Sequence, residues 1–125
     1  MKVGILIIAR LNSKGLPNKA VLPIMGRPAI SYLIERAKLC KKAHVVILCT
    51  GDEKNNQELV RIAQEEGIKY YCGDETDVVS RMLGACKKER LDVIVRATGD
   101  DIFFSHEHAD LTIEHLLKTN SDYSH

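Results

Sequence analysis

Apolar runs and amphipathic stretches alternate along the whole chain. Short apolar runs rich in β-branched residues are typical of strands buried on both faces, and they predict strands at 3–9, 45–49, 68–72 and 92–97. Between them, apolar residues recur at helical spacing, which predicts helices at about 28–42, 55–66, 77–88 and 107–118. Strands that alternate with helices indicate βαβ units, right-handed crossovers and a mostly parallel sheet.

The ends and faces of these helices carry their own signals. Pro28 suits the first turn of the first helix, and Lys41 and Lys42 suit the negative end of its dipole. Gly67 is typical of the stop after the second helix. We expect inward residues on the first three helices. On the helix at 28–42 they are Ala29, Leu33, Ile34, Ala37 and Leu39; on the helix at 55–66 they are Leu59, Val60, Ile62 and Ala63; and on the helix at 77–88 they are Val78, Val79, Met82, Leu83 and Cys86.

Length and composition fit one globular domain. The chain has 125 residues, of which 45% are hydrophobic and 28% charged, with no internal repeat and no linker. We therefore expect a single α/β domain over 1–125. In such sheets ligands bind beyond the carboxyl ends of the strands.

The apolar run at 3–9 is far shorter than the roughly 20 residues of a membrane span. Only Lys2 precedes it, and an arginine-containing loop follows in place of a small-residue cleavage site, so it does not resemble a signal peptide. We expect a soluble, cytoplasmic protein that does not bind membranes. The cysteines form no CxxC pair, so we expect all four to be buried, reduced and structural: Cys40, Cys49, Cys72 and Cys86.

Charge is distributed unevenly. Residues 1–42 hold nine Lys or Arg against Glu35 alone, a net charge of +8, whereas the remaining residues hold nine Lys or Arg against sixteen Asp or Glu, a net charge of −7. A basic start and an acidic remainder favour an anionic ligand near the first part and a cation near the second. The pI of about 7.7 and the 5% aromatic content do not favour nucleic acid.

The loop at 10–19 combines Arg10, Lys14 and Lys19 with Ser13 and Gly15, directly after the first predicted strand. It matches neither the dinucleotide fingerprint nor the Walker P-loop. Backbone N–H groups and cations in such a loop suit a polyphosphate. The alternative from composition is a solvated basic loop.

Four blocks of the chain resemble the acylneuraminate cytidylyltransferase family, which includes the CMP-sialic acid and CMP-Kdo synthetases and the spore-coat polysaccharide synthesis proteins. The blocks are 9–19, 21–28, 73–81 and 92–100, in the family's order, and the last two are most similar to the spore-coat branch. The resemblance implies a three-layer Rossmann-like sheet of the nucleotide-diphospho-sugar transferase type.

The resemblance also implies roles for individual residues. Arg10 and Lys19 would hold the CTP triphosphate as the catalytic cations. The nucleotide-binding set would be Ala9, Arg10, Ser13, Lys14, Gly15, Lys19, Arg81 and Gly99. For Arg81, a solvated helix charge is the alternative.

Asp100 and Asp101 follow the fourth predicted strand. Adjacent carboxylates beyond a strand end suit Mg²⁺, which is held by one or two carboxylates together with phosphate oxygens. The alternative is a turn that approaches a helix, where Asp is common. The family resemblance implies that Asp100 is the metal-binding carboxylate, so we expect Mg²⁺ as the cofactor.

The implied activity is transfer of CMP from CTP to a sugar, an acidic one of the sialic acid or Kdo type, with release of pyrophosphate, for surface polysaccharide synthesis. Two alternatives remain: a non-catalytic nucleotide-binding or interaction domain of the same fold, and a nucleotidyltransferase for another base or a sugar 1-phosphate. The chain departs from the family at Gly15, where the spore-coat branch has Arg, and at 101–104, where a proline-bearing segment is replaced. Family members are also longer, so we expect that this nucleotide-binding domain lacks the family's C-terminal sugar-binding, often dimerising segment. A homodimer is a further expectation.

Overall fold

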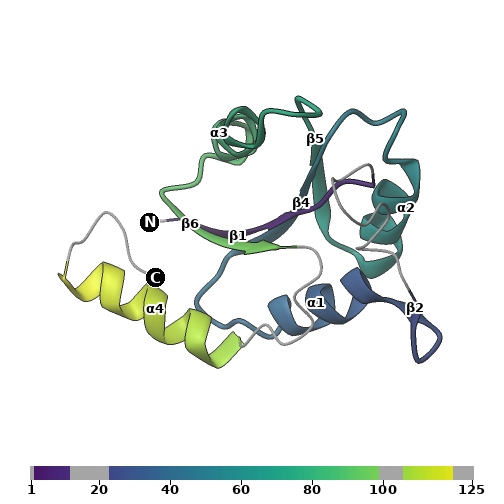
Figure 1. Cartoon of the computed structure of the whole chain (residues 1–125). Helices are drawn as coiled ribbons and strands as arrows, with labels where there is room; N and C mark the ends of the chain where they lie inside the picture. Colours follow the sequence, from purple (N-terminus) through teal and green to yellow (C-terminus); the bar gives the residue numbers. More distant parts are fainter. Residues whose placement is uncertain (1, 12–22, 99–105, 120–125) are drawn as a thin grey trace.

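The computed structural model describes residues 2–11, 23–98 and 106–119 (Figure 1). Its elements, in chain order, are β1 (Val3–Ile8), β2 (Pro23–Ile24), β3 (Arg27–Pro28), α1 (Ala29–Ala37), β4 (Val45–Thr50), α2 (Gln57–Glu66), β5 (Lys69–Cys72), α3 (Val78–Glu89), β6 (Val93–Thr98) and α4 (His106–Thr119). The predicted strands and helices are all present, with ends that differ by at most two residues except at α1, which was predicted to run to about residue 42 and ends at Ala37.

Four strands form a parallel sheet in the order β5-β4-β1-β6. The chain moves outward from β1 to β4 and β5 and then returns to the other side of β1 as β6. In β1, Ile5 pairs with Val46 of β4 and with Val95 of β6. This central position explains why β1 is an uninterrupted apolar run, because both of its faces are covered. The prediction of a mostly parallel α/β sheet is confirmed.

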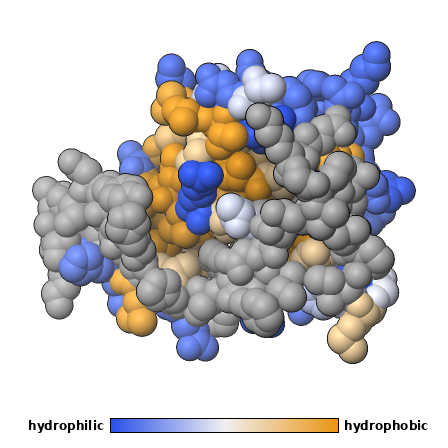
Figure 2. Space-filling model, in the orientation of Figure 1, coloured by the Kyte–Doolittle hydropathy of each residue, from blue (hydrophilic) through white to orange (hydrophobic). Residues whose placement is uncertain are grey.

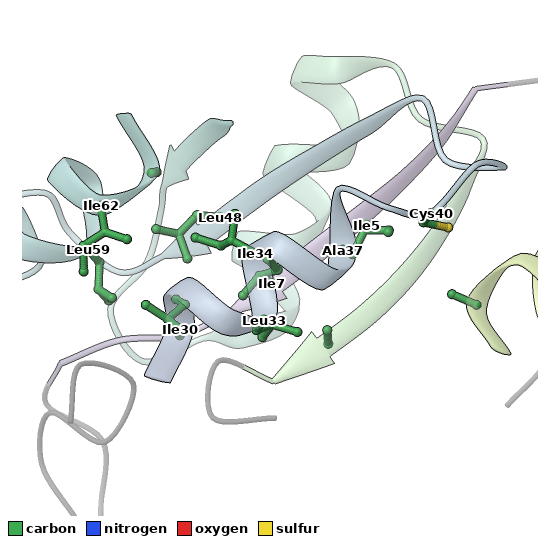
Figure 3. Close-up of a cluster of buried hydrophobic side chains, with 14 of the residues drawn as sticks. Ile5, Ile7, Ile30, Leu33, Ile34, Ala37, Cys40, Leu48, Leu59 and Ile62 are labelled. Atoms are coloured by element: carbon green, nitrogen blue, oxygen red, sulfur yellow. The ribbon is translucent and has the colours of Figure 1, made fainter. Parts of the chain in front are cut away.

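Helices cover both faces of the sheet. Alternate side chains of β1 point to opposite faces, and Ile5 and Ile7 pack in one cluster with α1, α2 and α4, as Figure 3 shows for the first two helices. Leu6 packs in a second cluster with Ala85 of α3 and with Leu91. The molecule therefore has three layers, with α3 alone among the described helices on its face.

Gly67 ends α2 as predicted, because its φ of 74° is left-handed. The role predicted for Pro28 is wrong. Pro28 is extended, with φ −58° and ψ 141°, and it precedes α1 as the last residue of β3. The cause is a hairpin of β2 and β3 that sequence analysis missed: Met25 and Gly26 both have positive φ, as a tight two-residue hairpin turn requires.

The inward faces of α1 and α2 are largely as predicted, except that Leu39 is 54% exposed. The predicted face of α3 is wrong in part. Met82 and Cys86 pack against the second cluster as predicted, but Val79 and Leu83 are exposed, whereas Arg81 and Ala85 are buried. The cause is a close approach at Gly84, where an added Cβ would lie 2.1 Å from Tyr71 Oη of β5. Figure 2 shows apolar side chains gathered on the surface around α3 and β6.

The four cysteines are free, but only Cys40 and Cys49 are buried. Cys72 and Cys86 are half-buried, so the prediction is wrong for these two. Cys72 ends the edge strand β5, where one side of the strand has no described neighbour, and Cys86 donates a hydrogen bond to the Leu91 carbonyl at 3.3 Å. Among the helices of the described ranges, none is long and apolar enough to span a membrane.

Candidate functional site

Polar side chains meet where β1, β4 and β5 end. Because parallel strands end at the same edge, residues far apart in sequence come together there. We call the set of Arg10, Thr50, Asn56, Glu75 and Arg81 the carboxyl-edge cluster. Arg10 follows β1, Thr50 ends β4, Asn56 precedes α2, Glu75 follows β5 and Arg81 lies in α3.

The Glu75 carboxylate is the centre of this cluster. Its Oε1 accepts hydrogen bonds from Asn56 Nδ2 at 2.9 Å and from the Asp52 N–H at 3.1 Å. Its Oε2 lies 3.5 Å from Arg10 Nη1. One carboxylate therefore joins the segments that follow three strands.

The carboxylate reaches across the end of β4, which lies between β1 and β5 in the sheet. Strands in a sheet are about 4.8 Å apart, so β1 and β5 are separated by about 10 Å. Gly51 leaves the space that this requires, because a Cβ there would lie 2.1 Å from Glu75 Oε1. The glycine directly after β4 is thus needed for its lack of a side chain.

Arg10 is held through its terminal nitrogen and through the backbone around it. Arg10 Nη1 donates to the Glu75 carbonyl oxygen at 2.9 Å. On either side, the Ala9 N–H donates to the Cys49 carbonyl at 3.3 Å and the Leu11 N–H donates to Asn56 Oδ1 at 2.9 Å. Ala9 is buried, whereas the Arg10 side chain is about a quarter exposed. Arg10 can therefore meet a ligand while its backbone stays fixed.

Arg81 is not a solvated helix charge, because only 1% of it is exposed. Its Nη1 donates to the Cys49 carbonyl at 3.4 Å, and burial lowers its pKa. The side chain fits because Gly73 has no Cβ, which would lie 2.8 Å from Arg81 Cγ. The alternative of a solvated helix charge is therefore wrong, and Arg81 places a buried cation against the carboxyl end of β4.

Three buried side-chain atoms lack a hydrogen-bond partner among the described residues: Thr50 Oγ1, Glu75 Oε2 and Arg81 Nε. Of these, Glu75 Oε2 has the longer ion-pair contact with Arg10 given above. All three belong to the carboxyl-edge cluster. An unpaired buried polar group costs about 1–3 kcal/mol. Their concentration at one edge of the sheet is typical of a site that binds a polar ligand.

The turn that presents Glu75 is built by Asp74. Asp74 Oδ1 accepts hydrogen bonds from the N–H groups of Thr76 and Asp77 and from Thr76 Oγ1. The Asp77 and Thr76 N–H groups lower the pKa of Asp74, so it is a charged acceptor at neutral pH. Asp77 in turn caps α3 by accepting from the Ser80 N–H at 3.0 Å.

Several residues predicted for the site lie outside the described residues: Ser13, Lys14, Gly15, Lys19, Gly99, Asp100 and Asp101. Their roles stay predictions. Of the predicted set, the structure places Ala9, Arg10 and Arg81 at the same edge. In the part of the chain that the structure describes, no group of three or more His, Cys, Asp or Glu side chains could hold a metal ion.

Thr50, Asn56 and Glu75 were not among the residues predicted for the site. Thr50 ends a predicted strand, and Glu75 lies inside one of the blocks that carry the family resemblance, so their positions gave some signal. Asn56 gave none, because the helix predicted at 55–66 placed it inside the first turn, whereas α2 begins at Gln57.

Comparison with known proteins identifies the family of the chain. A protein family described as cytidylyltransferase matches residues 4–125. An uncharacterized protein of Methanocaldococcus jannaschii is 39% identical over 98% of this chain and 51% of its own length. The 3-deoxy-manno-octulosonate cytidylyltransferase of Chlorobium chlorochromatii is 32% identical over 96% of this chain and 48% of its own.

The spore coat polysaccharide biosynthesis protein SpsF of Bacillus subtilis is also a relative, at 26% identity over 96% of this chain and 52% of its own. A solved structure of a cytidylyltransferase from Leptospira borgpetersenii superposes with a TM-score of 0.91 at 34% identity, and the match covers 97% of this chain and 51% of that one. The chain thus spans about half the length of the relatives it matches. Both the fold and the resemblance expected from sequence are confirmed, and the chain belongs to the cytidylyltransferase family.

Proposed function

We propose that this protein transfers CMP from CTP to an acidic sugar of the sialic acid or Kdo type, with release of pyrophosphate, and that the carboxyl-edge cluster is part of its nucleotide site. The observation that carries the proposal is the placement of Arg10: a partly exposed guanidinium on a fixed backbone, beside buried polar atoms that have no hydrogen-bond partner among the described residues. Membership of the cytidylyltransferase family supports the reaction, and the name of the Chlorobium relative supports the sugar class.

In the proposed reaction a sugar hydroxyl attacks the α-phosphorus of CTP in line. The new O–P bond forms as the bond from the α-phosphorus to the bridging oxygen breaks, and pyrophosphate leaves with that electron pair while the hydroxyl proton passes to solvent. The protein must position the triphosphate and neutralise the charge that develops on the leaving group. Arg10 would do this from the end of β1, with Lys19 as a second cation.

Asp100 and Asp101 are adjacent carboxylates that follow β6 in the sequence, a donor set that suits magnesium. Ile8 and Thr98 pair at the ends of β1 and β6, and Asp100 follows Thr98 by two residues as Arg10 follows Ile8. We propose that Asp100, with Asp101, holds the ion, since a hard cation prefers carboxylate and phosphate oxygens. When bound, Mg²⁺ would supply charge neutralisation to the phosphates.

Calorimetric titration with CTP, ATP, GTP and UTP, with and without Mg²⁺, tests the proposal. We expect Mg²⁺-dependent binding with a preference for CTP, weakened about 100-fold in Arg10→Ala and made independent of Mg²⁺ in Asp100→Asn. Arg61→Ala is the matched control, because Arg61 is an exposed cation on α2 that pairs only loosely with Glu58 and Glu65.

Pyrophosphate release from CTP in the presence of sialic acid or Kdo is the second measurement. Binding of CTP without release would favour the alternative of a nucleotide-binding domain without turnover. Equal affinity for another nucleotide would favour a different base, and no binding of any nucleotide would contradict the proposal and favour an interaction domain.

A further inference from the structure

We propose that Glu75 and Asn56 are positioning residues that orient Arg10 and the backbone amide of Leu11 before the nucleotide binds. This inference rests on the proposed function, because it gives Arg10 a phosphate ligand. It adds two residues that act through Arg10 and do not touch the ligand themselves.

Asn56 is used in a way that its position does not explain. It is the N-cap residue of α2, where an Asn side chain ordinarily accepts a hydrogen bond from its own helix. Here it makes no such bond. Instead its Oδ1 accepts from the Leu11 N–H at 2.9 Å, while its Nδ2 donates to the Asp52 carbonyl at 2.8 Å and to Glu75 Oε1 at 2.9 Å.

The Asn56 side chain is fully buried, and each of its polar atoms is engaged in these bonds. A buried amide with this complement of partners has one orientation only. It therefore fixes the Leu11 N–H, and with it the first residues after β1, relative to the ends of β4 and β5. The Asn56 side chain does not cap α2 and instead holds the segment that carries Arg10 in place.

Glu75 completes the arrangement from the other side. It meets Arg10 Nη1 twice, through its carbonyl oxygen at 2.9 Å and its carboxylate at 3.5 Å. Within the described ranges both contacts use the same terminal nitrogen, and a guanidinium carries further N–H donors on its other nitrogens. Glu75 can thus orient Arg10 and leave donors for a phosphate.

The two possible roles of the Glu75 charge predict opposite changes in CTP affinity when that charge is removed. A carboxylate that merely competed with the triphosphate for Arg10 would weaken CTP binding. Its neutralisation in Glu75→Gln would then raise the affinity for CTP. A carboxylate that orients Arg10 does the opposite: its neutralisation should weaken CTP, on the order of tenfold for the loss of a charged hydrogen-bonding partner.

The experiment measures the Kd of CTP and of CMP by calorimetry for the wild-type chain and for Glu75→Gln and Glu75→Ala. We expect weaker CTP binding in both variants and an affinity for CMP that changes less than the affinity for CTP, because Arg10 would act on the triphosphate. General structural damage would lower both affinities together. Glu65→Gln is the matched control, since it neutralises a glutamate 3.8 Å from an exposed arginine on α2.

Hydrogen exchange gives a readout that needs no nucleotide. In Asn56→Ala the Leu11 amide should exchange faster, while amides in the middle of β1 keep their protection. Unchanged exchange at Leu11, or CTP binding that is unchanged or tighter in Glu75→Gln, would overturn the inference and leave the proposed function standing. If the wild-type chain binds no CTP, both fail together, which distinguishes the two results.

Discussion

The Glu75 carboxylate lies 3.5 Å from the Arg10 guanidinium, although 65 positions separate the two residues and β4 lies between their strands. The pair spans the end of β4 because the residue directly after that strand is Gly51. The site therefore depends on the segments that follow β1, β4 and β5, and a change in any of them should alter the orientation of Arg10.

Gly51→Ala should disturb the site and the fold together. Its Cβ would lie 2.1 Å from Glu75 Oε1 and 3.1 Å from Asn56 Nδ2, so the carboxylate must leave its bonds to Asn56 and Asp52. We expect a loss of about 1–3 kcal/mol in the free energy of unfolding, because buried polar groups lose partners. CTP affinity should fall as well, by about tenfold. Chemical denaturation and calorimetry on the same samples measure the two effects.

Gly67→Ala is the contrasting variant. It places a side chain at φ 74°, with no neighbouring atom within 4 Å, so it should cost about 1 kcal/mol of stability through backbone strain. It lies far from Arg10 in the chain and should leave CTP affinity unchanged. Equal losses of affinity in the two variants would show that the Gly51 effect is a general loss of stability.

Gly84→Ala should destabilise the protein although Ala favours a helix. Helix propensity alone predicts a gain of about 1 kcal/mol for this change in the middle of α3. The contact with Tyr71 opposes it, because the new Cβ would lie 2.1 Å from Tyr71 Oη and 2.6 Å from Cζ. We expect the steric effect to win, since overpacking typically costs about 1–3 kcal/mol.

A double-mutant cycle separates the two terms for Gly84. In the Tyr71→Ala background the same Gly84→Ala change should become stabilising, because only the helix propensity remains. A change of equal size and sign in both backgrounds, measured by urea denaturation, would mean that Tyr71 does not set the packing of α3.

Arg81→Met should separate stability from binding. Arg81 is 1% exposed, and in the described part of the chain its guanidinium makes one 3.4 Å hydrogen bond, to the Cys49 carbonyl, and its Nε has no hydrogen-bond partner. Replacing a poorly paired buried charge by an apolar side chain of similar length is often neutral or stabilising. We expect a thermal midpoint at or above that of the wild type, together with weaker CTP binding.

Arg81→Ala is the control for volume. It removes the aliphatic stem as well and should cost about 2–4 kcal/mol, as other large-to-small changes in a core do. If Arg81→Met lost as much stability as Arg81→Ala, the charge itself would be the stabilising feature.

The buried thiols predict a loss of stability in alkali. Burial, followed by the hydrogen bond to Asp110, raises the pKa of Cys40 from its ordinary 9.0 to about 11, and burial raises the pKa of Cys49 from 9.0 to about 11 as well. Between these values the unfolded chain has released the proton and the folded chain has not. Stability is therefore fully present below pH 9 and falls as the pH rises to about 11.

Denaturation midpoints between pH 8 and pH 11 measure this effect. The double variant Cys40→Ala, Cys49→Ala should show a smaller decrease across the same interval. Iodoacetamide at pH 8 should leave Cys40 and Cys49 unmodified in the folded protein, because the thiolate is the reactive form. Rapid modification of either residue under native conditions would contradict the assigned pKa values.

Local pattern was enough to predict the elements. The continuous apolar run of β1, the helical spacing of Leu59 and Ile62, and Gly67 after α2 are features of neighbouring residues, which act through the backbone of their own segment. The position of Arg10 followed for the same reason, since a cation directly after a buried strand lies at the carboxyl edge of a parallel sheet. Its role as a triphosphate cation was implied by the family resemblance.

Tertiary structure decided what meets Arg10 and which side of α3 faces the sheet. From sequence, Asn56 falls in the first turn of a predicted helix and Glu75 is one of several acidic residues in a loop. For Arg81 a nucleotide contact and a solvated charge were both open. Each of the three depends on partners 30 or more positions away. The same holds for Val79 and Leu83, whose spacing fits a buried row until Gly84 meets Tyr71. Periodicity reports on the chain's own backbone, whereas burial and hydrogen bonding at the sheet's edge depend on which strand ends become neighbours.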